Sequence, residues 1–256
     1  MLTINLGGLL AALFSVLMVI FIAPGMFPEW LMRQQKMMDD EDSPADTWVN
    51  PGKHEYPMYF FLGQSGCGKD THVLKLLGKL QAEGVKYIYV SIGDQVRGLI
   101  EALGNENYFA QHMKHVNDQG KLQPASIPLH FSLSKFIPEY TGEEVIIING
   151  SPRSHRELKM WASLIQIGYL PNAKIIHIDV TDDECRNRLV NRPDRPDTED
   201  AAARETKLAW YKPIRKWLNE KLPTGVEVVT IDGMRPIEDV AQSIEKFFVA
   251  EDVLIG

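Results

Sequence analysis

The sequence feature that most constrains the fold is a glycine-rich turn that follows a short apolar run and precedes a helical pattern. The turn reads GQSGCGKDT over residues 63–71, between the apolar run 59–62 and apolar residues spaced as on one helix face. Strand, glycine-rich turn and helix form the setting of a phosphate-binding loop, in which backbone N–H groups surround phosphate oxygens. In such a loop Lys69 supplies positive charge to the β- and γ-phosphates, and Thr71 offers a hydroxyl near Mg²⁺. Because a turn that only needs glycines leaves Lys69 unexplained, the sequence predicts a nucleotide site.

Short β-branched runs alternate with helical patterns from residue 57 onward. Such runs are typical of buried parallel strands, and the alternation predicts a doubly wound α/β domain with five parallel strands wrapped by helices. The predicted strands are 59–62, 86–90, 145–148, 174–180 and 226–231. The predicted helices include 95–103, 156–167, 182–190, 201–222 and 237–248.

Composition excludes some classes of function. The 256 residues carry a formal net charge of −7, which argues against a nucleic-acid-binding surface as the main function. The hydrophobic share of 45% is enough for a full core. The two cysteines, Cys67 and Cys185, lie far apart in the sequence and suggest neither a disulfide framework nor a zinc site.

The N-terminus has the pattern of a membrane segment. Residues 6–23 read LGGLLAALFSVLMVIFIA without a charge, which is about enough helix to cross a bilayer. No Lys or Arg precedes the run and no small-x-small cleavage site ends it, so an anchor is favoured over a cleaved signal peptide. Arg33 and Lys36 follow the run and place the rest of the chain in the cytoplasm. We therefore interpret residues 1–28 as a single-pass anchor, 29–56 as a polar linker and 57–256 as the α/β domain.

Arginines recur where the predicted strands end or in the segments that follow them. This edge is where α/β folds build their sites. The residues are Arg97, Arg153, Arg188, Arg192, Arg195 and Arg204. Transfer of a phosphoryl group between two nucleotides needs several cations, because several phosphate charges must be neutralised and aligned. One arginine alone is usually a surface charge, but this set after one phosphate loop indicates two phosphate-binding regions.

At these motifs the chain resembles the adenylate kinase and nucleoside monophosphate kinase family. GQSGCGKDT resembles the family loop GxPGxGKGT, SIGDQVR at 91–97 resembles TGDxxR, and NGSPR at 149–153 resembles DGFPR. GKLQP at 120–124 resembles GxLVP, RLVNR at 188–192 resembles RxxxR, and IDG at 231–233 resembles the late turn near the donor base. The resemblance covers about 59–248 in the family's order and spacing.

The resemblance implies transfer of the γ-phosphoryl group of ATP to a nucleoside monophosphate, AMP by default, giving two ADP. It implies catalytic roles for Lys69, Arg153, Arg188, Arg192 and Arg195. It implies ATP contacts from Gly63, Ser65, Gly66, Cys67, Gly68, Lys69, Asp70, Thr71, Arg188 and Gly233. It implies monophosphate contacts from Ser91, Gly93, Asp94, Arg97, Gln123, Gly150, Arg153, Glu157, Arg195 and Arg204. The partners are thus ATP, a monophosphate and, through residues 6–23, a lipid bilayer, with no nucleic acid.

The resemblance also implies moving segments and a metal. Residues of about 92–135 would cover the acceptor, and 192–204 would form a short donor lid without zinc ligands. Mg²⁺ would be held with ATP through Thr71 and water, with no direct protein carboxylate.

Several positions differ from the family pattern, among them Ile92, which replaces the Thr typical of adenylate kinases. Asn149 stands where the family has an Asp that orients Mg²⁺ through water, and Asp70 adds negative charge beside the phosphates. Glu157 stands where the family has the Gln that reads adenine. A carboxylate only accepts hydrogen bonds, which suits the N1–H of guanine or the amino group of cytosine. A kinase for GMP, CMP or dTMP is therefore the first alternative, and an anchored nucleotide sensor with weak catalysis is the second.

Overall fold

The structure is a computed structural model that describes residues 54–191, 201–220 and 222–255. The chain divides into a unit 1–48 and a unit 49–256, and every described residue belongs to the second. The predicted anchor, nearly all of the predicted linker, and Arg192 and Arg195 of the predicted lid lie outside the described residues. Within the described ranges, no helix combines the length and apolar character needed to cross a bilayer.

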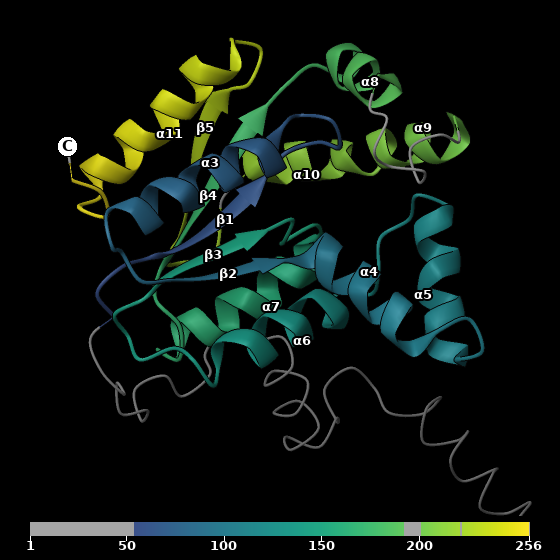
Figure 1. Ribbon diagram of the computed structural model, residues 1–256, viewed down its shortest axis with the longest axis horizontal. Coiled ribbons are helices and arrows are strands. Elements are labelled where there is room, and N and C mark those ends of the chain that lie inside the picture. Colours follow the sequence, from purple (N-terminus) through teal and green to yellow (C-terminus); the bar gives the residue numbers. More distant parts are fainter. Residues whose placement is uncertain (1–53, 192–200, 221, 256) are drawn as a thin grey trace, which may run out of the picture. The chain divides into compact units, whose positions relative to one another are not determined.

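The sheet has five parallel strands, as predicted (Figure 1). Its order is β2-β3-β1-β4-β5, so the strand that enters the phosphate loop is central. The bounds are β1 Met58–Leu62, β2 Tyr87–Ser91, β3 Val145–Asn149, β4 Ala173–Asp179 and β5 Val226–Asp232. In the register, Phe60 of β1 lies opposite Ile148 of β3 and Ile175 of β4.

Helices cover both faces of this sheet. They are α3 Lys69–Ala82, α4 Ile92–Leu103, α5 Tyr108–Asp118, α6 Ser126–Phe136, α7 His155–Gln166, α8 Asp182–Val190, α9 Ala201–Ala209, α10 Tyr211–Leu218 and α11 Ile237–Ala250. Helices lie in each of the five predicted segments, although one segment is divided, and α5 and α6 were not predicted. Figure 1 shows α3 and α11 on one face, with α6 and α7 on the other.

The single helix predicted over 201–222 is wrong, because the segment forms two helices, α9 and α10. Pro213 explains the break. It has no N–H to donate to the carbonyl group of Ala209, and its ring would clash with that carbonyl in a continuous helix. In the structure Pro213 is the third residue of α10, where a helix needs no such donor.

Side chains of β1 alternate between two apolar clusters. Phe60 packs in one cluster with Trp161 of α7, whereas Phe61 packs in the other with Leu76 of α3. All five residues of β1 are buried, because successive side chains point to opposite faces and both faces are covered. This explains why β1 is apolar throughout rather than alternating.

The packing predicts a clear difference between two leucines of α3. Leu76 is 2% exposed and Leu74 is 62% exposed. We expect Leu76→Ala to lower the free energy of unfolding by about 2–5 kcal/mol, since it leaves a cavity. Leu74→Ala should change it by no more than about 0.5 kcal/mol. Urea denaturation of both variants tests this, and equal losses would contradict the assignment of the core.

Candidate phosphate-binding cleft

A cleft of about 1460 Å³ lies at the edge of the sheet where strands β1–β3 end. Its lining comes from the phosphate loop, α4, α5, the end of β3, α7, α8, α9 and the turn before α11. Residues predicted for both nucleotides are thus brought to one cavity. Those that line it are Ser65, Gly66, Gly68, Lys69, Asp70, Thr71, Ser91, Gly93, Arg97, Gln123, Arg153, Glu157, Arg188 and Gly233, and Asn149 lines it as well.

The phosphate loop has the predicted strand, turn and helix. Gly66 and Gly68 have φ values of 89° and 88°, a backbone conformation that L side chains rarely adopt. A Cβ atom on Gly66 would also lie 2.6 Å from the carbonyl oxygen of Cys185. The helix α3 begins directly at Lys69, whose amine lies 3.5 Å from Asp70. The first-turn N–H groups of α3 have no preceding turn to bond, and together with the helix dipole they favour an anion at this point.

Two residues of the loop, Gly63 and Cys67, and Cys185 of α8 support the fold rather than line the cleft. Cys67 is 1% exposed, and its N–H donates to the carbonyl group of Gln64 at 3.0 Å. Burial raises the pKa of the Cys67 thiol, and it raises that of Cys185 to about 12, so both are protonated at neutral pH. Gly63 leaves room for the Cys67 sulfur, which a Cβ atom there would displace. Any contact of Cys67 or Gly63 with ATP would therefore come from the backbone.

The predicted acceptor side is built around Arg153, which follows β3. Burial lowers the pKa of its guanidinium, and the nearby charges of Glu157 and Asp70 oppose that shift. Its Cζ atom lies 5.6 Å from the ring centre of Trp210. Gly150 has a φ of 86°, and a Cβ atom there would clash with the guanidinium. The turn after β3 thus holds the Arg153 guanidinium at the cleft.

Glu157 has a structural role that the sequence did not reveal. It is 2% exposed, and it accepts hydrogen bonds from the Ser151 hydroxyl and, at 2.8 Å, from the Arg153 backbone N–H. Ser151 in turn accepts a bond of 3.0 Å from the indole N–H of Trp161. Burial raises the pKa of the Glu157 carboxyl. Glu157 therefore shapes the turn that carries Arg153, in addition to lining the cleft.

The other residues of the predicted acceptor side line the cleft, hold the helices around it, or do both. Arg97 lines the cleft and forms an ion pair with Asp94, which does not line it. Ser91 caps α4 by accepting a bond from the Asp94 N–H at 3.4 Å. Gln123 lines the cleft and also holds α5, because its amide donates to the carbonyl group of Met113 at 2.8 Å.

On the predicted donor side, Arg188 joins three elements. Its guanidinium donates to the Cys67 carbonyl at 3.3 Å and to the Gly233 carbonyl at 3.2 Å. Its Nε atom donates to Glu184 of the same helix at 2.7 Å. The phosphate loop, α8 and the turn after β5 thus meet at one cation, which agrees with the predicted proximity of Arg188 and Gly233 to the loop.

Arg204 is on α9 but does not line the cleft, whereas Lys207, one turn later, does. The role of Arg204 as a monophosphate contact therefore stays a prediction, while α9 places Lys207 at the cleft. Lys207 belongs to no sequence motif that would have predicted it as a residue of the cleft. Further lining residues that were not predicted include His72, Lys114, Lys121, Met234 and Arg235.

Comparison with known proteins identifies the domain. A family model described as "AAA domain" matches residues 62–206, more than half of the chain. The chain belongs to the AAA-domain family.

Among similar proteins of this AAA-domain chain are several named adenylate kinase. "Adenylate kinase" of Chlamydia trachomatis serovar L2 is 30% identical over 149 residues, 53% of this chain and 57% of that protein. "Adenylate kinase" of Dehalococcoides mccartyi is 32% identical over 135 residues, 52% of this chain and 57% of that protein. "Adenylate kinase 1" of a Nostoc species is 22% identical over 185 residues, 72% of this chain and 95% of that protein. The chain therefore spans little more than half the length of the first two relatives.

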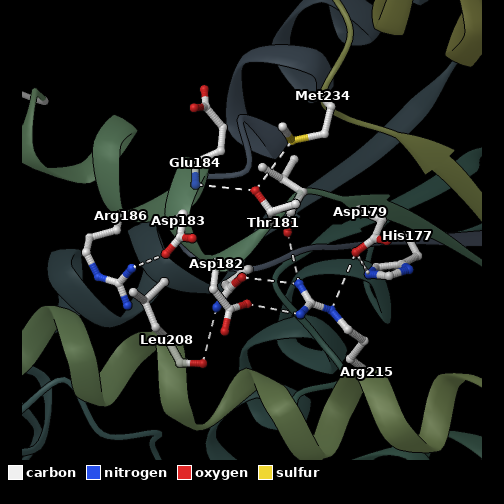
Figure 2. Close-up of polar contacts among 12 residues, drawn as sticks. His177, Asp179, Thr181, Asp182, Asp183, Glu184, Arg186, Leu208, Arg215 and Met234 are labelled. Carbon is white, nitrogen blue, oxygen red and sulfur yellow. Dashed lines mark hydrogen bonds and ion pairs between the residues drawn. The ribbon is translucent and has the colours of Figure 1, made fainter.

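Behind the phosphate loop of this AAA domain, Arg215 of α10 joins several elements (Figure 2). Its Nη1 atom donates to Asp182 at 3.0 Å, and its Nη2 atom donates to the Val180 carbonyl at 2.9 Å. Its Nε atom lies 3.4 Å from Asp179. The Nη2 atom also donates to Gln64 of the loop at 3.3 Å. Nothing in the sequence pattern distinguished Arg215 from a surface arginine.

Gln64 extends this network to α9. Its side chain is 1% exposed and donates to the Leu208 carbonyl at 3.2 Å. Nearby His177 lies 3.9 Å from Asp179, but burial lowers the pKa of its imidazole, so the ring is neutral at neutral pH and forms no ion pair. Arg215 is therefore the cation that ties the loop to β4, α8 and α10.

The network predicts that Arg215 contributes more to stability than an exposed arginine with similar ion pairs. We expect Arg215→Ala to lower the free energy of unfolding by about 1–3 kcal/mol, because it leaves Gln64 and two carboxylates without their partner. The matched control is Arg186→Ala, which removes exposed ion pairs to Asp183 and Glu205, each at 2.7 Å. The control should cost less than about 1 kcal/mol. Similar losses in urea denaturation would show that Arg215 is only a surface charge.

Proposed function

We propose that this AAA domain transfers the γ-phosphoryl group of ATP to a nucleoside monophosphate, with AMP as the first candidate acceptor. One observation carries the proposal. A phosphate loop with Lys69 and two further cations, Arg97 and Arg153 from separate elements, line the same cleft. A protein that binds one nucleotide has no physical need for a second phosphate-binding region. The names of the similar proteins support the same reading.

In the proposed reaction the protein contributes charge and position. Lys69 and the loop amides bind the donor phosphates, and Arg97 and Arg153 orient the acceptor phosphate toward them. Arg188 supplies positive charge beside the loop and keeps the loop fixed through its bonds to Cys67 and Gly233. No general base is required, because electrostatic stabilisation and alignment carry most of this chemistry.

The described residues fit a magnesium ion bound together with ATP. Oxygen donors at the cleft are Thr71, Asp70 and Asn149, and the Asn149 Oδ1 atom is buried without a hydrogen-bond partner among the described residues. These are the hard oxygen ligands that Mg²⁺ prefers. These residues would hold the ion with ATP, and its charge would offset that of the phosphates.

We also propose two moving segments and a membrane location. The segment 92–135, which contains α4, α5 and α6, would close over the acceptor, and 192–204 would close over the donor and exclude water.

Residues 6–23 would hold the domain at the cytoplasmic side of a bilayer. Fractionation tests the last point. The full chain should resist extraction from membranes by carbonate, and a chain without residues 1–53 should not bind them.

The reaction is tested by incubating the full chain with Mg·ATP and, separately, AMP, GMP, CMP and dTMP, and measuring ADP. We expect ADP formation that depends on a monophosphate, with AMP the most efficient. A preference for GMP or CMP would instead assign Glu157 to reading the acceptor base. Absence of transfer to all four, with ATP bound, would favour a nucleotide sensor over a kinase.

A further inference from the structure

Two residues that differ from the nucleoside monophosphate kinase pattern contact each other in the cleft. Asn149 is the last residue of β3, and Asp70 lies in the first turn of α3, 79 positions earlier. The Asn149 amide nitrogen donates to Asp70 Oδ1 at 2.8 Å. Both residues line the cleft beside Lys69 and Thr71. The two differences are therefore parts of one local arrangement.

The hydrogen bonds fix how the Asn149 amide is oriented. Its nitrogen faces Asp70 and also donates to the Tyr89 hydroxyl at 3.3 Å. The reverse orientation would place its oxygen against a carboxylate oxygen, and two acceptors repel. Asn149 is 3% exposed, and its Oδ1 atom is buried without a hydrogen-bond partner in the described part of the chain. A buried acceptor of this kind is rare and costly unless water or a ligand satisfies it.

The negative charge of Asp70 is unexpected at a site for phosphates. A carboxylate in the first turn of α3 lies where phosphate oxygens are expected, and like charges repel unless a cation lies between them. Lys69, at 3.5 Å, supplies one cation, but the same amine is the one that the phosphates require. A carboxylate has about four acceptor positions, so Asp70 can serve Asn149, Lys69 and a metal-bound water together.

We propose that Asp70 and Asn149 together form the protein side of a hydrated Mg²⁺ site in which the carboxylate and the neutral residue have exchanged places. Asp70, on the helix, supplies the negative charge. Asn149, at the end of β3, holds the Asp70 carboxylate through its amide nitrogen and accepts a hydrogen bond from a metal-bound water through Oδ1. Mg²⁺ suits this arrangement because it keeps several waters and uses one or two carboxylates with the substrate phosphates. The inference rests on the proposed function, since the ion enters with ATP.

The test measures metal binding rather than turnover. The full chain is saturated with a non-hydrolysable ATP analogue, and Mn²⁺ binding to the complex is followed by electron paramagnetic resonance, with Mg²⁺ as competitor. We expect Asp70→Asn to weaken Mn²⁺ binding at least tenfold. Affinity for the analogue in EDTA should not fall, because the substitution removes a charge that repels phosphate. Asp239→Asn, in the exposed first turn of α11, is the matched control and should leave metal binding unchanged.

A double variant tests the exchange itself. Asp70→Asn combined with Asn149→Asp keeps the composition and the net charge and returns the carboxylate to the end of β3. We expect it to bind Mn²⁺ within about threefold of the natural chain. If Asp70→Asn binds Mn²⁺ like the natural chain, or if the double variant stays as weak as the single one, the proposal is wrong. If the natural chain binds no ATP analogue at all, with or without metal, the proposed function fails first.

Discussion

Lys69→Ala is expected to lower the proposed phosphoryl transfer by about 10²–10³-fold, because it removes a preorganised charge from the donor phosphates. The Lys69 side chain is 16% exposed and stands at the first position of α3, so few waters can replace its ammonium group. The fold should survive, since the ion pair of Lys69 joins it to its own neighbour, Asp70, rather than to a distant element. ADP formation at saturating substrate measures the effect.

The control for this prediction lies on the same helix. The Lys75 amine pairs with Glu238 at the surface, 2.7 Å away, and Lys75 does not line the cleft. Lys75→Ala should therefore keep the natural rate within about twofold. A Lys69→Ala enzyme that is as fast as the Lys75→Ala enzyme would show that the loop does not hold the reacting phosphates.

Arg153→Ala is expected to impair the acceptor side, with a loss of about 10²-fold or more in kcat/KM for the monophosphate. Its guanidinium is partly desolvated, lies 5.6 Å from the ring centre of Trp210 and is close to the charge of Glu157, so it is already positioned before a phosphate arrives. Binding of the ATP analogue should stay within about threefold, because the donor phosphates use the loop and Lys69. Steady-state kinetics with varied monophosphate separates the two sides.

Two further variants distinguish position from charge. Arg153→Lys keeps the charge but loses the planar fork, so we expect it to recover only part of the activity. Arg156→Ala, on the exposed side of α7, is the control for a lost arginine and should behave like the natural chain. If Arg153→Ala weakens ATP and monophosphate equally, the division of the cleft into donor and acceptor sides is wrong.

The sheet and the phosphate loop could be predicted because their signals are local. The strands are β-branched runs buried on both faces, and the loop places glycines and Lys69 at a fixed spacing. The break between α9 and α10 was also present in the sequence as Pro213, but the apolar period over 201–222 concealed it. The helices α5 and α6 were missed because their apolar pattern did not separate them from the rest of the segment 92–135.

The contacts within the site could not be predicted, because they join residues that are distant in sequence. Asp70 and Asn149 were each visible as a difference from the family pattern, but only the fold shows that they share a hydrogen bond. Arg215 and Gln64 have no signal of their own, since their role depends on four elements meeting behind the loop. Lys207 lines the cleft instead of Arg204 because of the angle at which α9 is set, which sequence spacing does not determine.

In the proposed reaction, one cleft holds the phosphates of two nucleotides at once. Isothermal titration of AMP into the full chain, already saturated with Mg²⁺ and a non-hydrolysable ATP analogue, tests it most directly. We predict one AMP per chain, bound with an affinity that the analogue does not reduce, and loss of that binding in Arg153→Ala but not in Arg156→Ala. If AMP binds only when the analogue is absent and each displaces the other, the cleft holds a single nucleotide and the proposed transfer between two bound nucleotides is wrong.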